Sequence, residues 1–312
     1  MASVSTLHGG ARLTADLQEK LKRKAFWVRQ KVMEMAVRAG SGHISSAFSQ
    51  TEMLVALYQG GILRCRPQEP RWSDRDRMVP SRGQGGIGFY PILADMGYFP
   101  LAELDNFCGE GSRLGVHMEW EVPGVEIISG SLGHGLPIAT GMAQVALNEG
   151  KDYLVYCYLG DGELYEGSNW EAAFFAGKKR QHNLICIVDR NGQGVLGFTE
   201  GDGTSRDGPG IEPLDKKFEA FNFEVRVIDG HDYGQIYAAL ADVRTRKSDQ
   251  PLAIIAKTLK GKGLSLMENQ RMWHYRVPAA DELQQALREL QLDPAAVAAP
   301  AGGKTAEGEQ GE

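Results

Sequence analysis

The spacing of apolar residues predicts a long helix near the start of the chain. Residues 14 to 39 place apolar side chains at the intervals of three and four that line one face of a helix. Gly40 follows, and glycine readily adopts the left-handed conformation that ends many helices. We therefore expect a helix that delivers the motif SGH, residues 41 to 43, at its carboxyl end.

The next apolar stretch predicts a second helix. Ser49 and Glu52 have the spacing of a capping box ahead of an apolar stretch that ends at Tyr58, and glycines at 60 and 61 close the pattern. The loop between the two helices, residues 40 to 48, would then be held at both ends.

Short runs rich in β-branched and apolar residues recur later in the chain, with helical patterns between them. The runs are VEIIS, YLVYCYL, NLICIV, FEVRVI and LAIIAKT, and the helical patterns are LPIATGMAQVALNEG, WEAAFFAGKKR and GQIYAALADVRTR. Strands that alternate with helices predict an α/β fold, a parallel sheet with helices on both faces. In such sheets ligands bind beyond the carboxyl ends of the strands, so functional side chains are expected there.

The pattern shows no internal repeat and no proline-rich linker, which favours a single domain over residues 14–292. Residues 1–13 are expected to form an N-terminal arm. Residues 293–312 are expected to form a flexible tail, because they end in AAPAGGKTAEGEQGE, which has few large apolar side chains to bury.

Charge and composition exclude several classes of partner. The chain has 34 Lys and Arg against 40 Asp and Glu, a formal net charge of −6, so no broad basic surface is available for nucleic acid. No stretch reaches the ~20 apolar residues of a membrane span, and the N-terminus lacks the apolar core of a signal peptide. The four cysteines show no CxxC spacing. We expect a soluble, cytoplasmic protein with buried thiols, and neither nucleic acid nor membrane as a partner.

Candidate metal ligands follow two neighbouring predicted strands. Asp161 stands in the sequence GDG directly after YLVYCYL, and Asn191 and Gln193 follow NLICIV. Since Asp161 and Asn191 are 30 residues apart with one helix between them, a β-α-β unit places both at the same edge of the sheet. A carboxylate, an amide oxygen and backbone carbonyls suit Mg²⁺, and the flanking glycines let a diphosphate approach the backbone.

These motifs resemble the thiamine diphosphate-binding half of the transketolase family. The matching segments are, in order, SGH (41–43), RDRMVPSRGQG (75–85), HMEWEVPGVEIISGSLGHGL (117–136), GDGELYEGSNWEAA (160–173), DGHD (229–232) and KGKGLSLMENQRMWH (260–274). The last segment is most similar to the N-terminal subunits of split, two-chain transketolases. The resemblance implies the family's diphosphate-binding domain, with thiamine diphosphate and Mg²⁺ as cofactors and Ca²⁺ or Mn²⁺ as alternative metals.

The resemblance also implies roles for individual residues. The metal ligands would be Asp161, Asn191 and the backbone oxygen of Gln193. The residues expected to contact the cofactor are Gln84, Gly130, Leu132, Gly160, Gly162, Glu163 and His274. Among these, the diphosphate would lie against Gly162 and His274, and the aminopyrimidine ring against Gly130 and Leu132.

The remaining implied roles concern the substrate and the assembly. His43 and His117 would face the sugar, where imidazoles hydrogen-bond hydroxyls and move protons near neutral pH. Glu166, with Glu171 as a further candidate, would join the acidic network that links the paired active sites of the family. Glu163 and Glu166 each keep a structural alternative, the first as an acid at the start of a helix and the second as a helix cap.

Two residues depart from the family pattern. Gln84 stands in SRGQ where the family usually has histidine, and glutamine donates hydrogen bonds but carries neither a positive charge nor a mobile proton. Tyr275 replaces a usual glycine after MWH and adds bulk near the diphosphate or the substrate channel. These departures concern sugar specificity more than cofactor binding.

The family's catalytic glutamate, which protonates the aminopyrimidine ring, comes from a second, pyrimidine-binding domain. After Arg276 only 36 residues remain, too few for such a domain. We therefore expect the chain to be inert alone and to act with a separate pyrimidine-binding subunit in an α2β2 assembly. The assembly would transfer a two-carbon ketol unit from a ketose or ketose phosphate to an acceptor.

Three alternatives remain open. One is a specialised ketol transferase whose acceptor is a lipoyl group or a carrier-protein thiol. Another is the α subunit of a 2-oxoacid dehydrogenase, which SGH and GSLGHG disfavour. The third is a non-catalytic regulatory partner of a pyrimidine-domain subunit, which the Asp161 and Asn191 pair disfavours.

Overall fold

Five strands form one parallel sheet at the centre of the protein. The computed structural model describes residues 12–194, 197–199 and 210–297. Within these ranges the strands are β1 (Arg77–Pro80), β2 (Val155–Gly160), β3 (Leu184–Arg190), β4 (Glu224–Asp229) and β5 (Leu252–Lys257). Their order across the sheet is β1-β2-β3-β5-β4, and every neighbouring pair is parallel. The predicted α/β fold with a parallel sheet is confirmed.

Helices precede and connect the strands. The α-helices in the described ranges are α1 (Ala15–Ala39), α2 (Ile44–Ser49), α3 (Thr51–Tyr58), α4 (Gly86–Met96), α5 (Gly135–Asn148), α6 (Gly167–Lys178), α7 (Leu214–Ala220), α8 (Tyr233–Leu240) and α9 (Ala280–Glu289). Short 3-10 helices are η1 (Gly83–Gly85), η2 (Leu101–Asn106), η3 (Gly162–Tyr165), η4 (Arg271–Trp273) and η5 (Pro294–Val297). Helix α1 ends as predicted, with Gly40 in the left-handed conformation at φ 63°.

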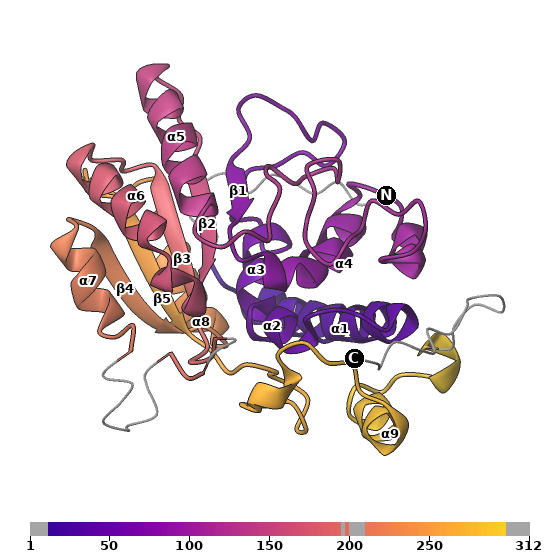
Figure 1. Cartoon of the computed structure of the whole chain (residues 1–312). Coiled ribbons are helices and arrows are strands. Elements are labelled where there is room, and N and C mark those ends of the chain that lie inside the picture. The colour runs from indigo at the N-terminus through magenta and orange to yellow at the C-terminus, as the bar shows by residue number, and fades with distance from the viewer. Residues whose placement is uncertain (1–11, 195–196, 200–209, 298–312) are drawn as a thin grey trace.

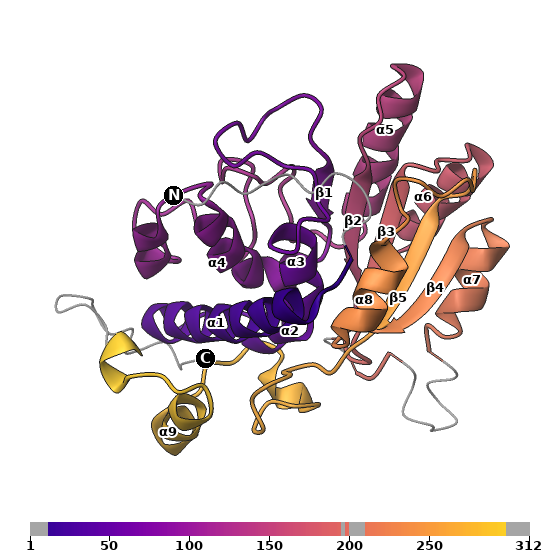
Figure 2. The ribbon, with the colours of Figure 1, turned by 180° about the vertical axis from the view of Figure 1, so that it is seen from behind.

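The helices cover both faces of the sheet (Figures 1 and 2). One core packs α1 to α4 and α8 against strand residues that include Tyr156 and Ile187. The other packs α5, α6 and α7 against residues that include Cys157 and Val188. Alternate strand residues thus enter opposite cores, as the two-residue period of a strand requires. Burial on both faces explains why the strand sequences read as continuous apolar runs.

The strand register brings the ends of the strands to one edge. Gly160 at the end of β2 pairs with Asp189 of β3, and Arg190 of β3 pairs with Lys257 at the end of β5. Strand β1 ends beside them, because Pro80 pairs with Tyr158. The loops that follow these four strands therefore start from the same carboxyl edge, where parallel sheets of this kind bind ligands.

One predicted strand is wrong, and one observed strand was not predicted. The run VEIIS is a loop: Val125 and Ile127 are buried, but Ile128 is exposed and the segment pairs with no strand among the described residues. Strand β1 is short and ends in Pro80, so its sequence carries little periodic signal. It lies at the edge of the sheet, where proline is tolerated because one side of the strand needs no hydrogen-bond partner.

The predicted capping box at residues 49 to 52 is also wrong. Residues 44 to 49 are already helical as α2, and Gln50 separates them from α3. Ser49 Oγ donates to Asp189 Oδ2 at 2.7 Å, and Glu52 forms an ion pair with Arg29 and accepts a hydrogen bond from His231 Nδ1. Both side chains are therefore used in tertiary contacts, which local spacing could not reveal.

The predicted arm and tail fall largely outside the described residues, which begin at residue 12 and end at residue 297. The packed part of the chain continues past the predicted boundary at residue 292. Helix η5 lies against α1, where Arg38 Nε donates to the carbonyl of Ala296 at 2.9 Å.

Within the described part of the chain, no helix has the length and apolar character needed to cross a lipid bilayer. The four cysteines are free thiols: Cys157 and Cys186 are buried in the sheet, as expected, whereas Cys65 is partly buried and Cys108 is exposed.

Gly177 allows a close approach between α6 and the end of α7. A Cβ at this position would lie 1.8 Å from the carbonyl oxygen of Phe221, so the backbone would have to move. We expect Gly177→Ala to lower the free energy of unfolding by roughly 2–3 kcal/mol. The matched control is Gly141→Ala on the exposed face of α5, where a Cβ meets nothing within 4 Å and helix propensity should add about 0.5–1 kcal/mol. Urea unfolding of both variants tests this, and equal effects would contradict the contact.

Candidate active site

A cavity of about 480 Å³ opens at the carboxyl edge of the sheet. It is lined by ten of the thirteen predicted site residues, namely Gln84, Leu132, Gly160, Asp161, Gly162, Glu163, Glu166, Asn191, Gln193 and His274. His43, His117 and Gly130 are not among its described lining residues, but His43 and His117 adjoin it through His274. The predicted residues therefore gather from distant parts of the sequence around one cavity.

Asp161 is the buried carboxylate at the floor of this cavity, with 1% of its surface exposed. Its Oδ2 accepts from the backbone N–H of Gly192 at 2.6 Å and from Thr199 Oγ1 at 3.0 Å, and its Oδ1 accepts from Gly162 N–H. Burial, together with the charge of Asp189, raises the pKa of Asp161 to about 6. Among the described residues, no basic side chain forms an ion pair with it.

Asn191 and Gln193 lie beside Asp161, as the spacing of the two strand ends predicts. The Asn191 amide donates from Nδ2 to Asp189 Oδ2 at 3.0 Å, while its Oδ1 accepts from the backbone N–H of Gln193 at 3.1 Å. Gln193 is buried, and its Nε2 donates to Asn269 Oδ1 at 2.6 Å. The hydrogen bond to Asp189 fixes which end of the Asn191 amide carries the oxygen.

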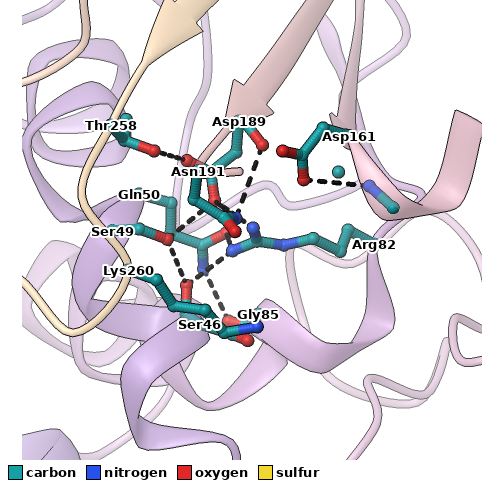
Figure 3. Close-up of polar contacts among 12 residues, drawn as sticks. Ser46, Ser49, Gln50, Arg82, Gly85, Asp161, Asp189, Asn191, Thr258 and Lys260 are labelled. Atoms are coloured by element: carbon teal, nitrogen blue, oxygen red, sulfur yellow. Dashed lines mark hydrogen bonds and ion pairs between the residues drawn. The ribbon is translucent and has the colours of Figure 1, made fainter. Parts of the chain in front are cut away.

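Asp189 and Arg82 form a buried ion pair that the sequence did not predict (Figure 3). Asp189 also accepts from Ser49 and Thr258, and Arg82 Nη2 donates to the Ser46 carbonyl at 2.5 Å. Burial acts to raise the pKa of Asp189, but Arg82 and the hydrogen bonds outweigh it and hold the pKa below its usual value. The pair ties the SRGQ loop, α2 and the end of β3 together beneath the cavity.

Lys260 is a second cavity residue that was not predicted. It is 2% exposed, and its Nζ lies 2.9 Å from His274 Nδ1. An ammonium group only donates, so His274 Nδ1 accepts and the proton of the neutral ring sits on Nε2. Burial, with smaller effects of Lys260 and Arg82, lowers the pKa of His274 to about 4. Lys260 therefore presents His274 to the cavity as a neutral donor.

Three histidines and a tyrosine form a cluster next to the cavity. The ring of His43 lies 5.8 Å from that of His117, 5.5 Å from that of His274 and 4.5 Å from that of Tyr275, measured between centroids. Burial lowers the pKa of His43 to about 3, so this ring is neutral. The Nδ1 atoms of His43 and His117 are buried and have no hydrogen-bond partner among the described residues. Such atoms are available to a polar ligand.

The predicted glycines bring backbone close to neighbouring groups. Gly130 has φ 120°, and a Cβ there would lie 3.1 Å from the His117 ring. At Gly160 a Cβ would lie 2.5 Å from Arg82 Cδ. A Cβ on Gly162 would lie 3.1 Å from the backbone of Gly194 across the cavity floor. Side chains at these positions would fill the space between the strand ends.

Glu163 stands in the first turn of η3, as its structural alternative predicts, and it is buried. It accepts from the backbone N–H of Gly133 at 3.1 Å and of Gly160 at 3.2 Å, and Ser81 Oγ also donates to it. Burial raises the pKa of Glu163, while these donors act in the opposite direction. Its side chain thus joins three loops at the edge of the cavity.

Glu166 is exposed at the cavity mouth, directly before α6. Glu166 is the N-cap residue of that helix, as the structural alternative places it, but its side chain makes no capping hydrogen bond. Gln84 also lines the cavity, and its Oε1 is buried without a hydrogen-bond partner among the described residues.

The donor set at the cavity floor fits a hard divalent cation. In the described ranges, no three His, Cys, Asp or Glu side chains are close enough to hold a metal by themselves. A metal here would combine the Asp161 carboxylate with the Asn191 amide oxygen and backbone carbonyls, which is a donor set suited to Mg²⁺. A buried carboxylate that accepts only from neutral donors gains stability from a bound cation. The chain therefore offers a site of the expected chemistry.

Comparison with known proteins places the chain in a family. Residues 21–300 match the family described as transketolase, thiamine diphosphate binding domain. The A subunit of the apulose-4-phosphate transketolase from Actinobacillus succinogenes is 38% identical over 87% of this chain and 96% of its own length. The 6-deoxy-6-sulfo-D-fructose transketolase subunit SqwG of a Clostridium species is 34% identical over 89% of this chain and 99% of its own length.

Solved structures agree with these relatives. The crystal structure of transketolase from Campylobacter jejuni superposes with a TM-score of 0.79 at 31% identity, over 90% of this chain. The chain spans only 44% of that transketolase, in contrast to its nearly complete match with the separate subunits of the split enzymes. This chain therefore belongs to the transketolase family and corresponds to the thiamine diphosphate-binding subunit of its split, two-chain members.

Proposed function

We propose that this chain, together with a separate pyrimidine-binding subunit, catalyses ketol transfer between sugars. The C2–C3 bond of a ketose breaks, and the two-carbon ketol unit joins the carbonyl carbon of an aldehyde acceptor. The products are a shortened aldose and a lengthened ketose, so the reaction needs no external oxidant or reductant. The observation that carries the proposal is that one cavity combines hard oxygen ligands, basic groups and the neutral His274, with His43 and His117 next to it.

The first part of this function is to hold the cofactor. Asp161, Asn191 and the carbonyl of Gln193 would hold Mg²⁺, and the metal would in turn hold the diphosphate. His274 and Lys260 would donate to diphosphate oxygens from the other wall of the cavity. When bound, thiamine diphosphate supplies the stabilised carbanion that the cleavage needs.

The second part is to orient the sugar. The His43 ring is neutral, and the Nδ1 atoms of His43 and His117 are buried without a hydrogen-bond partner among the described residues, which supports contacts with substrate hydroxyls. A neutral imidazole both donates and accepts a hydrogen bond, and it can pass a proton to or from a hydroxyl. Gln84 lines the same cavity and offers a neutral amide, which can donate and accept hydrogen bonds.

The relatives indicate the class of substrate. Their names specify apulose-4-phosphate and 6-deoxy-6-sulfo-D-fructose, and both are sugars that carry an anionic group. We infer a ketose with a phosphate or sulfonate group as the donor for this chain. The alternative acceptor is a lipoyl group or a carrier-protein thiol, and activity with it should be compared with activity toward a sugar acceptor.

The partner subunit would dock beside the cavity mouth, on α5 and α6. Ile138 and Val145 of α5 and Phe174 of α6 are large apolar side chains that are 40–58% exposed. Tyr165 and Glu166 continue this surface to the cavity lining, so a partner seated there would also close the cavity. The acidic network expected at Glu166 would then lie in the interface, in an α2β2 assembly.

Reconstitution tests the proposed function. The chain and its pyrimidine-binding partner, each purified separately, are assayed alone and mixed, with thiamine diphosphate and Mg²⁺. We expect ketol transfer from a ketose phosphate to an aldehyde only in the mixture, with little product when a lipoylated carrier replaces the aldehyde. Equal turnover by this chain alone would contradict the proposal, and so would a mixture that transfers nothing.

A further inference from the structure

Tyr275 covers the histidine cluster on its solvent side. It directly follows His274, and its ring lies 4.5 Å from the ring of His43 with a tilt of 46°. Its hydroxyl lies 2.8 Å from the Oγ of Ser41, the first residue of the SGH segment that ends in His43. The tyrosine is thus held at both ends, by the chain next to His274 and by Ser41, and spans His43.

His43 and Tyr275 differ strongly in their exposure to solvent. His43 is 9% exposed, whereas Tyr275 is 54% exposed. The exposed tyrosine ring therefore packs against a buried imidazole and contributes to its burial.

His43 connects Tyr275 with the residues that line the cavity. His43 contacts His274, and His274 lines the cavity together with Asp161 and Lys260. A sugar whose hydroxyls reach His43 from the cavity side meets the Tyr275 ring if its chain extends further in that direction. For a sugar bound at His43, the Tyr275 ring and its hydrogen bond to Ser41 would set one end of the space available to it.

We propose that Tyr275 is a specificity-determining residue that limits the length of the sugar accepted at the histidine cluster. This inference rests on the proposed ketol transfer and adds that the site selects its substrate by chain length. The selection is steric: the tyrosine ring, and not its hydroxyl, excludes the longer sugars. An enzyme distinguishes substrates that differ by one or two methylene groups by about tenfold or more in kcat/KM. Removal of a whole aromatic ring should therefore change the preference for sugar length clearly.

Acceptor length is the variable that tests the proposal. The assembled enzyme, with its partner subunit, thiamine diphosphate and Mg²⁺, is assayed with one donor and unphosphorylated α-hydroxyaldehydes of increasing chain length. We expect Tyr275→Ala and Tyr275→Gly to raise kcat/KM for the longest aldehyde, relative to the shortest, by about tenfold or more. Agreement between the two variants separates loss of the ring from the extra backbone freedom of glycine.

Two further variants complete the test. Tyr275→Phe keeps the ring and loses the bond to Ser41, so its length preference should match the wild type. Met272→Ala changes an exposed neighbour in η4 and should also leave the preference unchanged. An unchanged preference in the alanine variant would overturn the inference, as would equal relaxation in the alanine and phenylalanine variants. Absence of any ketol transfer by the wild-type assembly would instead overturn the proposed function, and this inference with it.

Discussion

Asp161→Ala should abolish cofactor-dependent activity. We expect kcat/KM of the assembled enzyme to fall by about a thousandfold or more, because a metal that clamps a phosphate group contributes several kcal/mol and each ~1.4 kcal/mol is a factor of ten. The alanine removes the only predicted carboxylate ligand from the cavity floor. Asn191 and backbone carbonyls alone would be a neutral and weak site for Mg²⁺.

Binding separates this effect from simple loss of folding. Calorimetry with Mg²⁺ and thiamine diphosphate, in the presence of the partner subunit, should show binding to the wild type and none to the variant. Both ligands together should also raise the unfolding temperature of the wild type, and not that of Asp161→Ala. The control is Asp215→Ala in the first turn of α7, away from the cavity, which should behave as the wild type. Equal binding by Asp161→Ala and wild type would remove the metal-ligand assignment.

Asp189→Ala should be the most destabilising single change at the site. It would leave the Arg82 guanidinium buried without its carboxylate, and Ser49, Thr258 and Asn191 would each lose an acceptor. Removal of one partner from a buried ion pair costs about 3–5 kcal/mol, because the remaining charge stays buried and uncompensated. Denaturant unfolding of the isolated chain measures the difference in free energy.

An exposed aspartate–arginine pair provides the matched control. Arg180 and Asp249 form an ion pair in which both side chains are more than half exposed. Asp249→Ala should therefore change the free energy of unfolding by about 1 kcal/mol or less. If both variants lost the same stability, burial would not be the source of the large effect, and the account of Asp189 would be wrong.

The sequence predicts the sheet well where strands are buried on both faces. The runs at β2, β3 and β5 are long, apolar and separated by helical patterns, so their order and parallel pairing follow from general rules. VEIIS and β1 show where this reasoning fails. Val125 and Ile127 are apolar because they pack in the interior, whereas Arg77–Pro80 pairs at an edge with few apolar residues. Composition alone does not separate packing from strand pairing.

The candidate site was predictable where its residues follow strand ends. Asp161 and Asn191 come together because β2 and β3 are parallel neighbours, which their spacing already indicates. Arg82, Asp189 and Lys260 were missed, although each stands inside a quoted motif or beside a predicted ligand. Their roles depend on partners up to 107 residues away, such as Arg82 with Asp189. No local pattern specifies such a pair.

The expectation for Glu163 illustrates the same limit. Its place after GDG predicts an acid at a helix start, and Glu163 does stand in the first turn of η3; the side chain also accepts from Gly133, 30 residues earlier, and from Ser81, 82 residues earlier. A buried carboxylate with these donors positions loops. Only the folded chain shows these distant contacts.

Transfer of labelled carbon tests the central claim most directly. A ketose donor that carries ¹³C at both C1 and C2 is incubated with an unlabelled aldehyde, Mg²⁺ and thiamine diphosphate. The account predicts that both labelled carbons appear together at C1 and C2 of the new ketose, and only when this chain and its pyrimidine-binding partner are both present. Intact transfer by this chain alone would contradict the account, and so would a complete assembly in which the label stays in the donor.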